Sequence, residues 1–75
     1  MTATKRILAG HILPNGAIVV AARRDGDSYA IVLCLRPGMR YQPYVVWILD
    51  LESKAAFGGD YHHELGAALS AFNHR

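Results

Sequence analysis

The hydrophobic positions of this chain fall into four stretches that contain no Asp, Glu, Lys or Arg. They cover residues 7–13, 17–22, 29–35 and 44–49, and short polar segments separate them. The last two stretches are rich in β-branched and aromatic residues and are too short for typical buried helices. The pattern therefore predicts strands over about 5–13, 17–24, 28–36 and 44–51.

Turn-forming residues lie between these stretches. Pro14-Asn15-Gly16 follows the first, and Asp25-Gly26 follows the second. Asn-Gly and Asp-Gly readily adopt positive φ, so both segments are expected to form hairpin turns. Residues 36–43 include two prolines and one glycine and predict a loop. Connections this short favour an antiparallel meander.

The C-terminal segment has the pattern of an amphipathic helix. Asp60 is a suitable N-cap after a Gly58-Gly59 turn. Apolar residues then recur at helical spacing, namely Tyr61, Leu65, Ala68, Leu69 and Phe72. A helix is expected over about 60–73. The predicted fold is a single α+β domain, a four-stranded antiparallel sheet with one C-terminal helix packed on one face (ββββα).

One such helix covers about half of one sheet face, and neither face alternates with polar residues. Trp47 is expected to pack against the helix at Leu65, Leu69 or Phe72. Because the second face is uncharged, a twofold homodimer is expected as well. Its expected residues come from the sheet and from the exposed helix face: Tyr44, Val46, Ile48, His63, Ala67 and Ser70.

Composition places the chain among small domains of a reducing compartment. Its 75 residues include one cysteine and carry a formal charge of +2. A single cysteine allows no internal disulfide. No stretch has the length of a membrane span or the features of a secretory signal. A cytoplasmic location without membrane contact is expected, in the host cell if the gene belongs to a phage.

Catalytic and metal-binding motifs fail on their spacing. His62-His63-Glu64 is similar to part of a zinc protease motif, which needs a second histidine four residues after the first. Counted from His63, that position holds Ala67. Cys34 lies within an apolar stretch, where an inert buried thiol is the usual state. We expect no enzymatic activity, no metal and no cofactor.

Charge is distributed unevenly over the predicted meander. The acidic residues are expected at the end where the helix begins, and the opposite end is expected to be free of acidic side chains. Arginine, tyrosine and methionine gather at that acid-free end, which predicts a partner-binding site. Arginine with tyrosine is typical of protein interfaces and also of nucleic-acid grooves. The expected residues are Arg36, Met39, Arg40, Tyr41, Tyr44 and Arg75.

The last third of the chain resembles small proteins encoded by phages, prophages and plasmids. The residues that carry the resemblance are Trp47, Gly58, Gly59, Tyr61, Leu65, Ala68, Phe72 and Arg75. Some proteins of that class inhibit host defences by covering a surface, anti-CRISPR proteins among them. The resemblance implies a mobile-element protein that acts by protein–protein occlusion on a host protein or ribonucleoprotein. A small basic nucleic-acid-binding or regulatory protein, and an oligomeric structural or accessory protein, are the alternatives.

Overall fold

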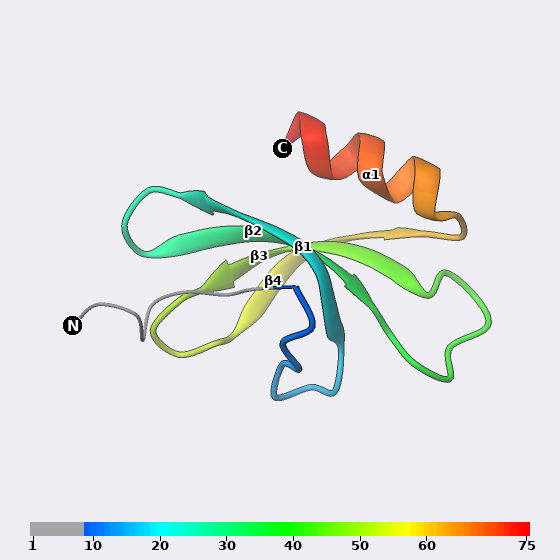
Figure 1. Ribbon diagram of the computed structural model, residues 1–75, viewed down its shortest axis with the longest axis horizontal. Coiled ribbons are helices and arrows are strands. Elements are labelled where there is room, and N and C mark those ends of the chain that lie inside the picture. Colours follow the sequence, from blue (N-terminus) through cyan, green and yellow to red (C-terminus); the bar gives the residue numbers. More distant parts are fainter. Residues whose placement is uncertain (1–8) are drawn as a thin grey trace.

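The computed structural model describes residues 9–75, and it is a four-stranded antiparallel sheet with one helix on one face (Figure 1). The strands lie side by side in chain order, and the predicted ββββα architecture is confirmed. The elements are β1 (Ile18–Asp25), β2 (Tyr29–Leu35), β3 (Tyr44–Asp50), β4 (Ala56–His62) and α1 (Leu65–His74).

Three of the strands follow the uncharged stretches of the sequence. β1, β2 and β3 correspond to the strands expected over about 17–24, 28–36 and 44–51. The turn between β1 and β2 contains Gly26 at a φ of 76°, the positive value that Asp-Gly turns provide. Alternating apolar residues on these strands fill a core on both faces of the sheet.

The fourth strand is β4, where the sequence predicted a turn and the start of the helix. His62 pairs with Tyr44 and Asp60 pairs with Val46. At Gly58 and Gly59 the strand holds one extra residue relative to β3, which makes a β-bulge, and Gly58 has a φ of 66°. The expected Gly58-Gly59 turn is wrong, because these glycines provide the bulge of an edge strand.

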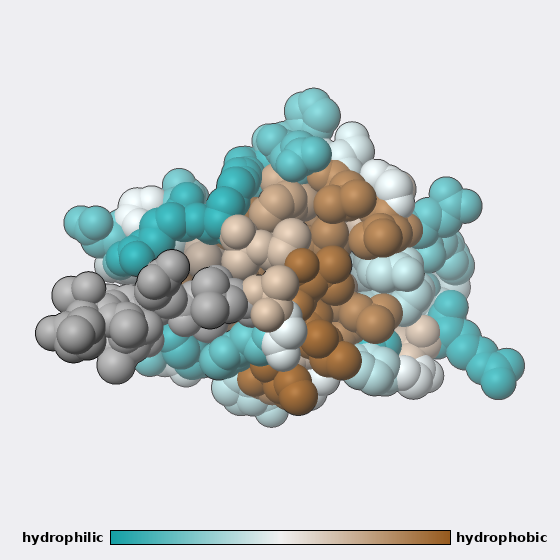
Figure 2. All heavy atoms as spheres, viewed as in Figure 1, coloured by the Kyte–Doolittle hydropathy of each residue, from teal (hydrophilic) through white to brown (hydrophobic). Residues whose placement is uncertain are grey.

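The helix therefore begins at Leu65, with Glu64 as its N-cap, and the expected start at Asp60 is wrong. Asp60 and Tyr61 belong to β4, because their backbone groups complete the ladder with β3. α1 buries Ala68 and Phe72 against the sheet. It covers only part of this face, and in Figure 2 hydrophobic side chains form a band from the region of α1 across β1.

The strand expected over about 5–13 is wrong for residues 9–13, and residues 5–8 lie outside the described part. In the rest of this segment only Ile12 makes a β-bridge, to Ile18. The chain follows β1 briefly, since the backbone nitrogen of Val19 donates to the carbonyl oxygen of His11 (2.8 Å). It then bends, and Leu13 is buried against the sheet (2% exposed).

Each face of the sheet has its own hydrophobic cluster. The helix-side cluster contains Ile31, Leu33, Val46, Ala68 and Phe72. The opposite cluster contains Leu13, Ala17, Val19, Ala30, Val32, Cys34, Val45, Trp47, Leu49 and Leu51. Trp47 thus lies on the face away from α1, and its expected contact with the helix is wrong. Its face is already covered by the 13–17 segment, so α1 packs on the Val46 face instead.

Candidate functional site

Arg36 holds the loop between β2 and β3 in place. Its Nη2 atom donates to the carbonyl oxygen of Gln42 (2.7 Å), and its guanidinium lies 4.6 Å from the ring centre of Tyr61. The backbone nitrogen of Arg36 donates to the carbonyl oxygen of Pro43 (2.8 Å), which closes the base of the loop. Gln42 adopts a φ of 50°, a value unusual for a residue other than glycine. Half-buried Arg36 is therefore a structural brace.

The tip of the braced loop is exposed. Tyr41 is 67% exposed and Met39 is 46% exposed, and Arg40 between them is exposed as well. The ring of Tyr41 meets the ring of His63 edge to face, with 4.7 Å between centres. We call Met39, Arg40, Tyr41 and His63 the loop surface. It contains three of the six residues expected to bind a partner.

Tyr44 and Arg75 do not belong to the loop surface. Tyr44 is half-buried and packs against the helix-side cluster. The Nη1 atom of Arg75 donates to the carbonyl oxygen of Val46 (3.2 Å), and Arg23 donates to the backbone carbonyl of Arg75. β4 ends beside the 36–43 loop, since His62 pairs with Tyr44. α1 therefore begins at that end of the sheet and runs back across it, so Arg75 lies away from the loop.

The direction of α1 also changes the charge at the end of the sheet where the 36–43 loop lies. Glu64 lies next to His63 where α1 begins, and it is exposed. The expectation that this end is free of acidic side chains is therefore wrong. The reason is that residues 60–62 belong to β4 and not to the helix. The helix therefore begins at the opposite end of the sheet from the one expected.

The residues expected at a self-association surface divide into two groups. Val46 is fully buried beneath α1, and Tyr44 and Ile48 are half-buried in the same cluster. The sheet residues therefore form no free surface, because the helix packs on them. The helix-side residues are exposed, namely His63, Ala67 and Ser70.

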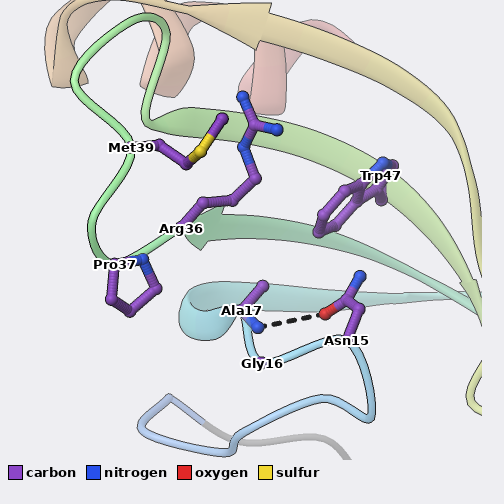
Figure 3. A pocket seen from close by; sticks show the side chains of 7 residues that line it. All are labelled: Asn15, Gly16, Ala17, Arg36, Pro37, Met39 and Trp47. Carbon is purple, nitrogen blue, oxygen red and sulfur yellow. Dashed lines mark hydrogen bonds between the residues drawn. The ribbon is translucent and has the colours of Figure 1, made fainter.

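A pocket of about 440 Å³ opens beside the loop surface (Figure 3). It lies between the 15–17 turn and the start of the 36–43 loop. Its lining residues are Asn15, Gly16, Ala17, Arg36, Pro37, Met39 and Trp47. The sequence did not indicate Asn15 or Trp47 as site residues, because only the bend after residue 12 brings the turn beside the indole. The Asn-Gly turn itself was the one available signal.

The adjacent histidines His62 and His63 contact different neighbours, and the cysteine is buried. His62 Nε2 lies 3.3 Å from a carboxylate oxygen of Asp60, whereas His63 contacts Tyr41. No group of three His, Cys, Asp or Glu side chains suited to a metal ion occurs within residues 9–75. Burial raises the pKa of the Cys34 thiol to about 12, so the nucleophilic thiolate is scarce at neutral pH.

In the described part of the chain, no helix has the length and apolar character needed to cross a membrane. No protein family, curated protein or solved structure matches this sequence or fold. The resemblance to mobile-element proteins stays a hypothesis. The loop surface and the adjoining pocket together form the candidate functional site.

Proposed function

We propose that this protein is a small non-enzymatic binding protein that docks on a partner protein through the loop surface. The observation that carries the proposal is the combination of exposed Tyr41 and Met39 with the internal brace at Arg36. Tyrosine, methionine and arginine are enriched in protein interfaces. A side chain as exposed as Tyr41 has most of its surface available for a partner.

The brace lowers the cost of binding. Arg36 is bonded to Gln42 and stacked on Tyr61, and Pro37 and Pro43 restrict the backbone at both ends of the loop. A loop that is already ordered loses less conformational entropy when a partner binds. Tyrosine adds contact area with few rotatable bonds, which keeps this loss small.

The charges favour a protein over a nucleic acid. Arg36 is committed to the brace, so Arg40 is the remaining arginine of the 36–43 segment. Glu64 adds a negative charge beside His63 at the same end. Nucleic-acid grooves combine several cations with aromatic residues, because affinity grows with the number of phosphates neutralised. We therefore favour a protein partner.

Occlusion is the proposed mode of action. The protein covers a surface of its partner and supplies no chemistry. A host-defence protein or ribonucleoprotein is the partner class that follows from the resemblance to phage and plasmid proteins. Such a role needs a shaped and stable contact surface, which the braced loop provides.

Site-specific crosslinking tests the proposal. A photoreactive phenylalanine analogue replaces Tyr41 in one variant and exposed Ser53, at the opposite end of the sheet, in the control. We expect one host protein to crosslink to position 41 and not to position 53, in the presence of nuclease. The purified pair is then measured with the double variant Arg40→Ala and Tyr41→Ala. We expect at least about 2 kcal/mol weaker binding, or about thirtyfold.

Two results would contradict the proposal. Equal crosslinking from both positions would mean that the loop surface is not the contact. Crosslinks from position 41 to nucleic acid and not to protein, with a steep dependence of binding on salt, would point to nucleic acid instead.

A further inference from the structure

The pocket beside the loop surface combines apolar walls with the amide nitrogen of Asn15, which makes no hydrogen bond within residues 9–75. The indole of Trp47, the thioether of Met39 and the ring of Pro37 line it, together with the aliphatic stem of Arg36. The guanidinium of Arg36 is directed toward Gln42 and Tyr61, so its charged group contacts these residues and its aliphatic stem faces the pocket. The walls therefore favour an apolar occupant.

Asn15 supplies the donor. Its Oδ1 atom accepts a hydrogen bond from the backbone nitrogen of Ala17 (3.0 Å), which fixes the orientation of the amide. The Nδ2 atom of the same amide therefore faces away from Ala17 and points toward the indole of Trp47 (Figure 3). Within residues 9–75 this nitrogen has no hydrogen-bond partner, and an amide nitrogen donates and does not accept, so its protons can be donated to an acceptor on the occupant. A carbonyl oxygen on the occupant matches this group.

Volume and charge limit the occupant further. A pocket of about 440 Å³ has room for a large side chain, and its lining residues include no acid. Aromatic anchors that fill a pocket at the centre of an interface contribute much of the binding energy of protein complexes. Met39 belongs both to the pocket and to the loop surface, so one partner segment reaches both.

We propose that this pocket receives an aromatic side chain from an extended segment of the partner protein, whose backbone carbonyl accepts a hydrogen bond from Asn15. The ring lies against Trp47 and Met39, and the amide of Asn15 fixes the direction of the segment. This inference rests on the proposed function, since it names the anchor of the same protein–protein contact.

Short peptides test the pocket without the partner. The probe is a blocked glycine–phenylalanine–glycine tripeptide, and the control has alanine in place of phenylalanine. Trp47 is the only tryptophan of the chain, so its fluorescence and its indole N–H resonance report occupancy directly. We expect saturable changes at Trp47 and at the Asn15 amide with the phenylalanine peptide, and at least about tenfold weaker binding of the alanine peptide.

Two variants separate the parts of the site. Asn15→Asp keeps an oxygen for the backbone nitrogen of Ala17 but removes the donor, and we expect between about twofold and tenfold weaker binding of the peptide. Met39→Ala removes a wall and weakens binding by several-fold. Ile12→Ala is the matched control, since it also shortens an exposed apolar side chain (65% exposed), outside the pocket.

The outcomes separate the pocket from the wider proposal. Absence of saturable changes at millimolar peptide, or equal binding of both peptides, overturns the pocket assignment even if position 41 still crosslinks to a partner. Changes at Trp47 that Ile12→Ala weakens as much as Met39→Ala also overturn it. Peptide binding with the expected variant pattern, but without a crosslinked partner, supports the pocket while the proposed function fails.

Discussion

Gly59 of β4 lies so close to the indole of Trp47 in β3 that no side chain fits between them. A Cβ atom at this position would lie 2.8 Å from Nε1 of Trp47 and 2.7 Å from Cε1 of Tyr61. The two rings meet edge to face at 6.3 Å, and the guanidinium of Arg36 lies over the ring of Tyr61. Gly59 thus connects the buried core to the braced loop.

Gly59→Ala is expected to destabilise the protein by about 1–3 kcal/mol, because the added methyl must displace the buried indole of Trp47 and the ring of Tyr61. Gly66→Ala is the control, since a Cβ there meets nothing within 4 Å and the residue lies in α1. We expect Gly66→Ala to be neutral or to stabilise by up to about 1 kcal/mol. Chemical denaturation measures both. Equal effects of the two substitutions would contradict the close contact at Gly59.

Leu13 and Ile12 are neighbours with opposite environments, which tests the bend before β1. Leu13 is 2% exposed in the Trp47 cluster, whereas Ile12 is 65% exposed. Leu13→Ala is expected to cost about 2–5 kcal/mol and to shift the fluorescence of Trp47. Ile12→Ala is expected to change stability by less than about 0.5 kcal/mol. A larger loss from Ile12→Ala would mean that this segment packs differently.

Cys34 makes stability depend on alkaline pH. Burial raises its pKa from 9.0 to about 12, so between these values the unfolded chain releases the proton and the folded chain keeps it. Stability contributed by the protonated thiol is present below pH 9 and is lost as the pH rises, by up to about 1.4 kcal/mol per pH unit. Denaturation from pH 8 to 11 is expected to show a steeper decline for the wild type than for Cys34→Ala.

A thiol reagent provides a second measurement at Cys34. The folded protein is expected to react slowly at pH 8, and denaturant is expected to expose the thiol at once. Fast labelling of the folded protein, or equal pH slopes for wild type and Cys34→Ala, would show that the thiol is not buried as described.

The sequence predicted the parts of the fold whose signal is local. The strands around Val19, Val32 and Val46 have long uncharged patterns, and β1, β2 and β3 lie there. β4 was not predicted, because two glycines interrupt its pattern of apolar residues. The role of Gly59 depends on its contact with Trp47, which belongs to another strand. Tyr61 fits a helical stripe and also a strand, and only the ladder with β3 decides between the two.

The candidate site was predicted only in part, because its local features can be read from the sequence and its contacts between distant residues cannot. The exposed tip around Tyr41 follows from the prolines and glycine of the loop. The roles of Arg36 and Asn15 depend on distant partners, since Tyr61 is in β4 and Trp47 is in β3. Arg75 was misplaced because the direction of α1 follows from β4. Because β4 was not predicted, Arg75 was expected at the wrong end of the sheet.

Arg36 and Arg40 are expected to have separate roles, although both are arginines of one loop. Arg36→Ala removes the bond to Gln42 and the stacking on Tyr61, so it is expected to cost about 1–2 kcal/mol and to speed amide exchange over residues 38–42. Arg40→Ala is expected to leave stability and amide exchange unchanged and to weaken only partner binding. Arg36→Lys is expected to resemble Arg36→Ala in part, because an ammonium does not stack as a planar guanidinium does. If Arg36→Ala unfolds like the wild type and its loop amides exchange at the same rate, the loop is not braced by Arg36. The entropic advantage proposed for binding would then be lost.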